Sequence, residues 1–416
     1  MRPGREASQS PASGPRVTMH GTHVRDPLNG DIRVRDAERA VLDSPPVQRL
    51  RYVGQIGYAQ VVWPGATHTR FVHSVGVLET ATRVAEAVDL PDDEVTNVRL
   101  AALLHDVGHG PFSHVSDHIE NDAHPVHEER SCAAIDDLAP LFPDDADPER
   151  IKAYVRGEAP LDIVAGTIDA DRLDYLRRDA ANTGVGGSVD VDTITKFVGR
   201  RGGTLYFERP ATRGIEALLT ARYRLLEDVH QNKTSAVART MLRRALERFF
   251  AANPEVGMLD HDDRTMHAAL LSADGPARYY YRRLVDRRLF KRALHLPMEW
   301  FERDRVRRLA DALNAREIEA VIAETAGVDT RRVLVDPPVT PDRDAFDAKI
   351  SVDGRLRPID EVSRFPDTLA ESEWQTVDLG VYAPEALGQT VAAAAHEVLN
   401  ERLETDLGEE PARTRA

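Results

Sequence analysis

Residues 98–114, VRLAALLHDVGHGPFSH, constrain the fold of this chain more than any other stretch of its sequence. The first half is apolar and predicts a buried helix, which the glycines and the proline that follow end or bend. The second half contains four side chains rich in metal-ligating atoms: His105, Asp106, His109 and His114. Because an unpaired buried charge is unfavourable, these side chains need partners, either a divalent metal or backbone groups and water.

The composition indicates a globular protein without a membrane span. A chain of 416 residues, 42% of them hydrophobic, can form roughly one to three domains. No apolar run approaches the ~20 residues of a membrane span, and the N-terminus lacks the apolar segment of a signal peptide, so we expect a soluble, cytoplasmic protein. The single cysteine, Cys132, excludes an internal disulfide and a cysteine-based zinc site. Any metal site must therefore consist of histidines and carboxylates.

The net charge of −15 argues against non-specific binding of nucleic acid, which requires a basic surface. The chain has five lysines against 49 arginines. An aspartate-rich, lysine-poor surface suits a cytoplasm of high salt concentration, where charges are strongly screened. The composition is therefore halophile-like, although a GC-rich genome would also favour arginine over lysine.

Before the apolar segment, the sequence predicts a hairpin and two helices. Two short extended runs around a Pro-Leu-Asn-Gly turn predict the hairpin at 23–34. The stretch PPVQRLRYVGQIG predicts a helix that places Gln48, Arg51 and Gln55 on one face, either solvated or against a ligand. The next helix is predicted at about 69–88 from the helical spacing of its apolar residues.

Two further polar segments favour a metal site. Arg70 and His73 fall in the first turn of the helix at 69–88, where they could supply an anion clamp and a metal ligand. The segment IDADRLDYLRRD at 168–179 contains four aspartates, which repel one another unless cations are close. Either neighbouring arginines neutralise them or at least one carboxylate faces a metal.

The C-terminal part predicts further helices and a small α+β lobe. Helical spacing runs through 306–327, and the runs at 331–339 and 347–359 predict strands around turns. A last helix precedes a tail at 406–416. The first 18 residues, rich in proline, glycine, serine and arginine, predict a disordered tail at the other end.

The polar segments together resemble a known family. A histidine on one helix, a His-Asp doublet on a second and an aspartate on a third form the pattern of the HD-domain metal-dependent phosphohydrolases. The stretches WPGATHTRFVHS, ALLHDVGHGPFSH, HEERS and IDADRLDYLRRD occur in the family's order. These stretches are similar to those of the SAM-and-HD-domain dNTP triphosphohydrolases and their prokaryotic relatives. The resemblance extends from about His23 to Lys233, and a weaker similarity follows at VDRRLFKRALHL. We expect no SAM-type helical domain upstream.

The resemblance implies a mainly α fold, with an HD-domain catalytic core at 19–255 and a C-terminal helical and α+β lobe at 256–405. It implies one divalent metal ion held by His73, His105, Asp106 and Asp171, with Mg²⁺ accompanying the bound nucleotide. Histidine and carboxylate ligands suit Fe, Mn, Zn, Co or Ni alike.

The resemblance also implies roles around the metal. Arg70 would bind phosphate, His109 would lie near the scissile bond, and His127 would act as general acid with Glu128 orienting it. The phosphates would be held by His114, Arg172, Arg222 and Lys233, and the sugar by Gln55, Tyr175 and Asp179. The sequence departs from the family at His230, where the vertebrate enzymes carry a tyrosine packed against the deoxyribose.

A separate activator site is implied as well. In regulated members an aspartate, a glutamine and an arginine at the spacing of Asp43, Gln48 and Arg51 read a guanine base, and Val24 and His23 fall where the hairpin contributes. On the residues alone, Asp43 is also a suitable helix cap and Arg51 a suitable surface charge. A GTP or dGTP site of this kind lies between subunits and implies a homo-oligomer, a dimer or a tetramer.

We therefore expect an enzyme that hydrolyses dNTPs to deoxynucleosides and inorganic triphosphate, with possible activation by a guanine nucleotide. The alternatives are an HD phosphohydrolase for another nucleotide, and a nucleotide- or RNA-binding regulator whose pocket is vestigial. A nucleotide substrate is the expected partner, no membrane is expected, and nucleic acid is disfavoured by the charge.

Overall fold

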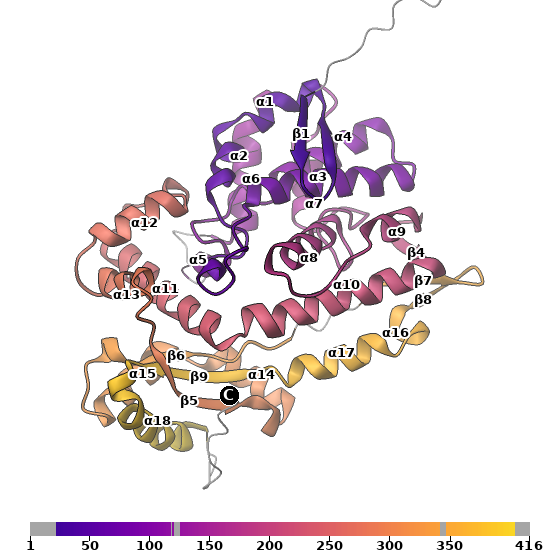
Figure 1. The fold of residues 1–416 in the computed structure, drawn as a ribbon. Coiled ribbons are helices and arrows are strands. Elements are labelled where there is room, and N and C mark those ends of the chain that lie inside the picture. The colour runs from indigo at the N-terminus through magenta and orange to yellow at the C-terminus, as the bar shows by residue number, and fades with distance from the viewer. Residues whose placement is uncertain (1–21, 118, 120–124, 342–346, 404–416) are drawn as a thin grey trace, which may run out of the picture.

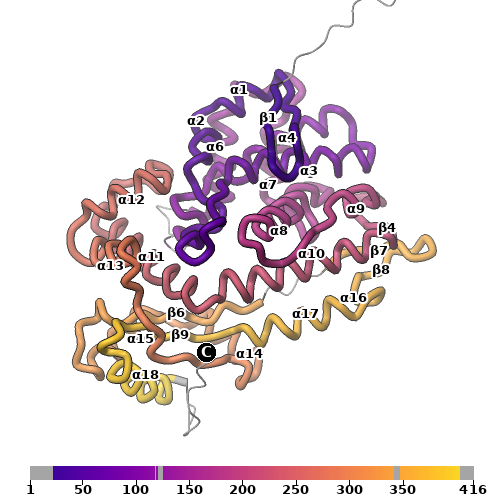
Figure 2. Tube along the Cα trace, viewed as in Figure 1, coloured from indigo at the N-terminus to yellow at the C-terminus, as the bar shows by residue number. Residues whose placement is uncertain are grey.

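A computed structural model describes residues 22–117, 119, 125–341 and 347–403. The predicted tails at 1–18 and 406–416 lie outside these residues. Figure 1 shows a helical N-terminal lobe, a long helical segment that crosses the molecule beneath it, and a C-terminal lobe with a small sheet on the other side. The tube in Figure 2 follows the same path without breaks in the described parts. The expected mainly α fold is confirmed.

The N-terminal lobe and the crossing segment contain most of the helices. Their elements are β1 (Thr22–Asp26), β2 (Gly30–Val34), α1 (Arg39–Leu42), α2 (Pro45–Arg49), α3 (Arg70–Ala87), α4 (Asp92–Leu104), α5 (His114–Asp117), α6 (His127–Leu138), α7 (Pro148–Val155), α8 (Ala170–Thr183), α9 (Val191–Lys196), β3 (Val198–Arg201), β4 (Thr204–Glu208), α10 (Thr212–Arg224), the π-helix η6 (Leu225–His230) and α11 (Lys233–Ala252).

The C-terminal part alternates helices with short strands. Its elements are α12 (Asp263–Ser272), α13 (Gly275–Val285), β5 (Lys291–Pro297), α14 (Arg303–Ala312), α15 (Ala315–Thr325), β6 (Leu334–Asp336), β7 (Lys349–Val352), β8 (Arg355–Pro358), α16 (Ile359–Val362), α17 (Phe365–Trp374), β9 (Asp378–Ala383) and α18 (Gly388–Leu403). None of the described helices is long and apolar enough to cross a membrane.

The predicted hairpin is confirmed as β1 and β2, which pair antiparallel with Val24 opposite Ile32. Ile32 and Val34 are buried and join the core of the N-terminal lobe. Asp26 closes the turn by accepting the backbone N–H groups of Leu28 and Asn29. The other oxygen of Asp26 lies 2.8 Å from Nη1 of the buried Arg178 on α8, so the hairpin is tied to that helix.

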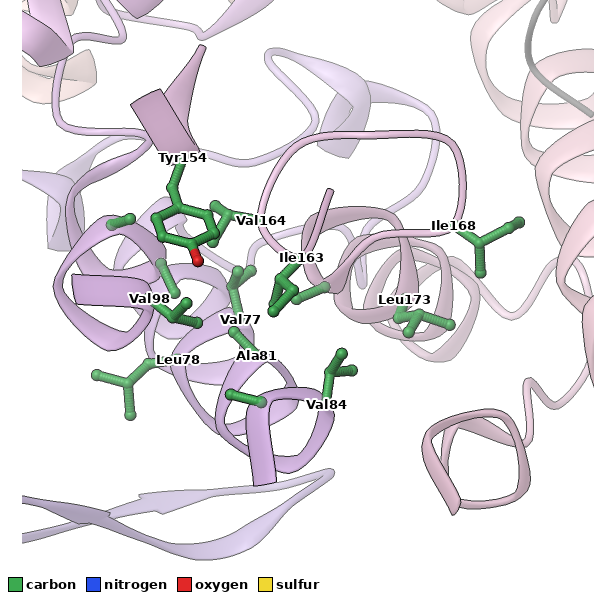
Figure 3. Close-up of a cluster of buried hydrophobic side chains, with 14 of the residues drawn as sticks. Val77, Leu78, Ala81, Val84, Val98, Tyr154, Ile163, Val164, Ile168 and Leu173 are labelled. Carbon is green, nitrogen blue, oxygen red and sulfur yellow. The ribbon is translucent and has the colours of Figure 1, made fainter. Parts of the chain in front are cut away.

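The three helices that carry the predicted metal ligands share one apolar core. Figure 3 shows Val77 and Ala81 of α3, Val98 of α4 and Leu173 of α8 in this core. Their approach leaves no room for a side chain at Gly76, where a Cβ atom would lie 2.1 Å from an oxygen of Asp174. Close packing of α3 on α8 therefore brings the first turns of both helices to one place.

The single helix predicted for PPVQRLRYVGQIG is wrong beyond Tyr52. Helix α2 ends at Arg49 and a 3₁₀ turn, η2 (Leu50–Tyr52), follows it. The backbone N–H of Gly54 then donates to a carboxylate oxygen of Asp263 at 2.9 Å, and that of Gln55 to the carbonyl of His68 at 3.0 Å. These distant partners replace the helical hydrogen bonds, so Gln55 does not continue the face of Gln48 and Arg51.

The C-terminal strands form two sheets, with the orders β3-β4-β7-β8 and β5-β9-β6. The strands predicted at 331–339 and 347–359 are confirmed as β6 and as the hairpin β7–β8, whereas β5 and β9 were not expected. The helix predicted over 306–327 is divided into α14 and α15, because Asn314 caps a new helix by accepting two backbone N–H groups. Strand β7 pairs parallel to β4. Part of the lobe predicted at 256–405 therefore packs on the predicted catalytic core. The domain boundary at residue 255 stays a prediction.

Candidate active site

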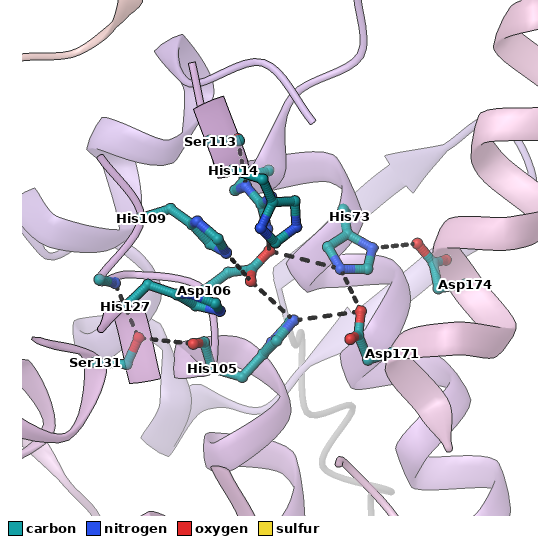
Figure 4. A network of polar contacts seen from close by, with 12 residues as sticks. His73, His105, Asp106, His109, Ser113, His114, His127, Ser131, Asp171 and Asp174 are labelled. Atoms are coloured by element: carbon teal, nitrogen blue, oxygen red, sulfur yellow. Dashed lines mark hydrogen bonds and ion pairs between the residues drawn. The ribbon is translucent and has the colours of Figure 1, made fainter. Parts of the chain in front are cut away.

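The four predicted metal ligands converge from three helices. His73 lies in the first turn of α3, His105 and Asp106 directly follow α4, and Asp171 lies in the first turn of α8. His73 Nε2 lies 2.9 Å from Asp171 Oδ1 and 3.6 Å from Asp106 Oδ2. His105 Nε2 lies 3.3 Å from Asp106 Oδ1 and 3.7 Å from Asp171 Oδ1. Figure 4 shows the four groups facing one point.

Each histidine of this set is oriented by its other ring nitrogen. His73 Nδ1 contacts Asp174 Oδ2 at 2.9 Å, and His105 Nδ1 contacts the carbonyl of Ala102 at 2.8 Å. Both rings therefore direct Nε2 inward, as metal-ligating histidines do. The Nε2 atom of His105 is buried and has no hydrogen-bond partner among the described residues. Two imidazoles, two carboxylates and this unused donor position fit a divalent cation.

The carboxylates of the site give it a strongly negative field. Burial lowers the pKa of His73, but Asp171, Asp174 and Asp106 together raise it to about 10. Burial also raises the pKa of Asp106, yet Arg70 and His105 hold it well below its usual range. The field that favours protonated imidazole would equally favour a divalent metal ion.

Arg70 connects the metal residues to the cavity beside them. Its Nη1 donates to Asp106 Oδ2 at 2.7 Å and its Nε to the hydroxyl of Ser113 at 2.6 Å. Its Nη2 is buried and has no partner among the described residues. A guanidinium fixed in this way presents a free donor to an anion beside the metal.

A second cluster of titratable groups adjoins the first (Figure 4). Its ligand atoms, which lie within 4.8 Å of one another, belong to His109, His114, Asp117 and His127. The rings of His109 and His127 stack with centroids 3.8 Å apart, and His109 Nε2 lies 3.3 Å from Asp106 Oδ1. His127 Nδ1 lies 3.4 Å from Glu128 Oε2, as the predicted pairing requires, and 3.7 Å from Asp117 Oδ2.

Asp117 is a member of this cluster that sequence reasoning missed. It accepts a hydrogen bond from His114 Nδ1 at 2.8 Å and also faces His109 and His127. It follows His114 by three residues, and this spacing on a helix was the one signal for their contact.

A cavity of about 710 Å³ opens beside both clusters. Most of the predicted catalytic and substrate residues line it: Gln55, Arg70, His105, Asp106, His109, His114, His127, Glu128, Asp171, Tyr175, Asp179 and Arg222. Arg172 and Lys233 are not among the lining residues. Arg172 donates to the carbonyl of Thr167 at 3.2 Å, and Lys233 is the first residue of α11.

Three more residues outside the predicted set lie at or behind the wall near Asp179. His68 Nε2 lies 2.7 Å from Asp179 Oδ1 and orients that carboxylate. The π-helix η6 inserts an irregular turn between α10 and α11 and brings His230 and Gln231 to the cavity. Burial lowers the pKa of His230 to about 4, so its ring is neutral at pH 7. No pattern in the sequence indicates the π-helix.

The predicted activator residues lie outside the lining of the cavity. Arg51 Nε donates to Gln48 Oε1 at 2.8 Å, and its guanidinium lies 3.5 Å from the centre of the Phe71 ring. Asp43 is exposed and Val24 is partly buried. Gln48 and Arg51 therefore form one contiguous polar surface, close to the start of α3.

Comparison with known proteins agrees with this geometry. The HD domain sequence model matches residues 70–177, and that of the HD associated region matches residues 189–409. An uncharacterized protein of Methanocaldococcus jannaschii is 30% identical over 372 residues, covering 87% of this chain and 79% of that protein. The deoxynucleoside triphosphate triphosphohydrolase SAMHD1 of Bos taurus is 31% identical over 222 residues. That match covers 42% of this chain and 38% of the bovine enzyme.

Two solved structures share the fold over most of the chain. The crystal structure of a phosphohydrolase from Bacteroides thetaiotaomicron has a TM-score of 0.71 at 25% identity, covering 88% of this chain and all of that one. A hypothetical protein from Aquifex aeolicus has a TM-score of 0.72 at 26% identity, covering 90% and 99%.

We predict that His105→Asn removes the bound metal without unfolding the protein. Asparagine is smaller than histidine and cannot place a donor atom at the position of Nε2, whereas the apolar neighbours of the ring are unchanged. Elemental analysis of the purified variant should show loss of the divalent metal that accompanies the wild type, with an unchanged circular dichroism spectrum. His396→Asn, on α18, is the matched control and should retain the metal. A full metal content in His105→Asn would contradict the assignment.

Proposed function

This chain belongs to the HD-domain phosphohydrolases, and we propose that it hydrolyses deoxynucleoside triphosphates to deoxynucleosides and inorganic triphosphate. The observation that supports this proposal is the cavity that brings together three of the four proposed metal residues, His105, Asp106 and Asp171, with the free donor of Arg70 and the sugar-suited side chains. Water adds to the α-phosphorus, the bond from phosphorus to the 5′-oxygen breaks, and the leaving oxygen takes a proton.

His73, His105, Asp106 and Asp171 would hold the metal. When bound, a divalent cation supplies Lewis-acid polarisation of phosphate and activation of water. Arg70 binds and orients a phosphate oxygen through Nη2, since its other nitrogens are already engaged. Positioning of this kind contributes to phosphoryl transfer more than covalent chemistry does.

His127 is the proposed donor of the proton to the 5′-oxygen. It lines the cavity, and the carboxylates of Glu128 and Asp117 lie beside its Nδ1. Their negative charge favours a proton on Nδ1 and leaves Nε2 for transfer. His114 is a second candidate, because its hydrogen bond to Asp117, at 2.8 Å, is shorter than either contact of His127.

The sugar would lie between Gln55, Tyr175 and Asp179. Gln55 and Asp179 are buried, and the Gln55 Oε1 atom has no partner among the described residues. Tyr175 presents an apolar ring beside them. Such an arrangement suits a hydroxyl on one edge of the sugar and a hydrocarbon face on the other.

The polar surface of Gln48 and Arg51 is the proposed activator site, together with Asp43 and Val24. The guanidinium of Arg51 is stacked on Phe71, the residue that follows Arg70. A nucleotide bound at Arg51 would therefore lie close to the first turn of α3. A guanine nucleotide is the proposed ligand, and a homo-oligomer that completes the site is the proposed assembly.

A product assay tests the function. Purified protein with Mn²⁺ or Mg²⁺ should convert at least one dNTP to its deoxynucleoside and release one inorganic triphosphate per turnover, measured by chromatography. NTPs serve as the comparison, because His230 leaves the selectivity against a 2′-hydroxyl open to measurement. Hydrolysis of another nucleotide without release of triphosphate would favour the first alternative, an HD enzyme with a different substrate. Binding without any hydrolysis would favour a regulator.

The activator proposal predicts that Arg51→Ala abolishes stimulation by GTP. The variant loses the stacked guanidinium but none of the cavity-lining groups, so its unstimulated rate and metal content should match those of the wild type. The measurement is the dNTP hydrolysis rate as a function of GTP concentration. Arg282→Ala is the control, because this exposed arginine of α13 pairs with Asp286 and contacts none of the proposed activator residues in the described part of the chain. Equal stimulation of wild type and Arg51→Ala would refute the site.

The pH dependence tests the proton donor. Burial lowers the pKa of His127, and Glu128 opposes this shift. A general acid acts only while protonated, so kcat/KM should fall as pH rises through a pKa below the ordinary value of about 6.5. Glu128→Gln removes the opposing carboxylate, so the fall of kcat/KM, the descending limb of the pH profile, should move to still lower pH. His127→Asn should remove the limb and reduce kcat by about 10²- to 10⁴-fold.

Glu129→Gln is the control for this series, because Glu129 is exposed and paired with Arg156. If the limb persists in His127→Asn and disappears in His114→Asn, the proton donor is the pair of His114 and Asp117 instead.

A further inference from the structure

The cavity extends beyond the catalytic residues to the C-terminal sheet. Alternate residues of β9 line this far part, namely Asp378, Gly380 and Tyr382, as expected for one face of a strand. The opposite wall is α11, from which Arg239 and Arg243 project four residues apart. Figure 1 shows α11 lying along the sheet formed by β5, β9 and β6.

Positive charge predominates in this far part. Nη2 of Arg239 and Nη2 of Arg243 lie 3.0 and 3.1 Å from the two oxygens of Asp336, so two guanidinium groups share one carboxylate. The other carboxylate, Asp378, lies 2.6 Å from His295 Nε2. Arg292, which pairs with Tyr382 in the β-ladder, adds a third guanidinium.

Two of these arginines have unused donors. The Nε atoms of Arg243 and Arg292 are buried and have no hydrogen-bond partner among the described residues. Burial lowers the pKa of Arg243, and Asp336 offsets only part of this effect. Buried N–H groups of a charged side chain are unfavourable without an acceptor. An anion in the cavity would supply that acceptor.

We propose that Arg239, Arg243 and Arg292, the distal arginines, form a phosphate-binding subsite at the far end of the catalytic cavity. The guanidinium fork matches the geometry of phosphate oxygens, and three such groups beside the two carboxylates of Asp336 and Asp378 leave net positive charge for a phosphate anion. The phosphate bound there has one of two sources. It belongs either to the substrate, as a phosphate group on the side of the sugar away from the triphosphate, or to a free inorganic phosphate chain.

The subsite is independent of the metal residues, because none of the distal arginines contacts His73, His105, Asp106 or Asp171 in the part of the chain that the structure describes. It shares a cavity with them, however. An occupant there either extends the substrate's contacts or sits beside the substrate. The subsite therefore determines which phosphorylated molecules the cavity accepts.

Titration calorimetry with sodium triphosphate tests the free source. The full chain with its metal should bind two equivalents, one at Arg70 and one at the distal arginines. Arg292→Gln and Arg243→Gln should each weaken the second equivalent by about tenfold or more, since each removes a charge-assisted hydrogen bond. Arg282→Gln is the control, because Arg282 is exposed and, among the described residues, forms its ion pair with Asp286, away from the cavity lining. An unchanged melting temperature of Arg292→Gln would show that the variant is folded.

Steady-state kinetics tests the substrate as the source. A dNTP that carries a 3′-phosphate should have a lower KM than the same dNTP without it, and Arg292→Gln should remove this difference. Loss in either experiment supports the subsite and identifies the source of the phosphate. Identical triphosphate binding and identical KM ratios in wild type, Arg292→Gln and Arg243→Gln would overturn it. Because the calorimetry needs no turnover, it decides the subsite even if no dNTP is hydrolysed.

Discussion

The buried carboxylate of Asp106 is the constraint on which the N-terminal lobe depends. It cannot stay charged in an apolar core without positive charge nearby, and Arg70, His105 and His73 lie beside it. Asp171, which is partly exposed to the cavity, completes the group of charges from α8. Helices α3, α4 and α8 must therefore keep their first or last turns together. The apolar core of Figure 3 lies directly behind these turns and holds them in place. The same arrangement creates the group of side chains that could hold a metal ion.

A chain of ion pairs continues this constraint to the N-terminal hairpin. His73 Nδ1 contacts Asp174, Asp174 receives two hydrogen bonds from Arg178, and Arg178 contacts Asp26 at the end of β1. All four side chains are buried. A displacement of the hairpin would thus alter the groups that orient a metal ligand. This contact path gives the proposed activator surface, which includes Val24 of β1, a physical route to the metal centre.

The resemblance to the family predicted the metal residues, and local sequence patterns predicted the helices that carry them, because each residue lies in or beside the terminal turn of a regular helix. The helical pattern gave the wrong position for Gln55. The backbone N–H of Gly54 donates to Asp263, 209 positions along the chain, and this hydrogen bond takes the place of a helical one. Local sequence patterns also missed Asp117, the π-helix that presents His230, and strands β5 and β9. Each of these is determined by tertiary contacts, and a helical or strand period in one window of sequence contains no information about them.

The C-terminal lobe completes the cavity. One helical segment, α10 through η6 to α11, carries Arg222 and His230 toward the catalytic residues and Arg239 and Arg243 toward the sheet. Arg222 Nη1 is paired with the buried Glu373 of α17, so the two lobes are joined at the cavity wall itself. Because Glu373 is buried, loss of Arg222 would remove a charged partner of this carboxylate and leave a gap in the cavity wall. The C-terminal lobe, which the sequence predicted as a separate unit, therefore forms part of the wall of the cavity.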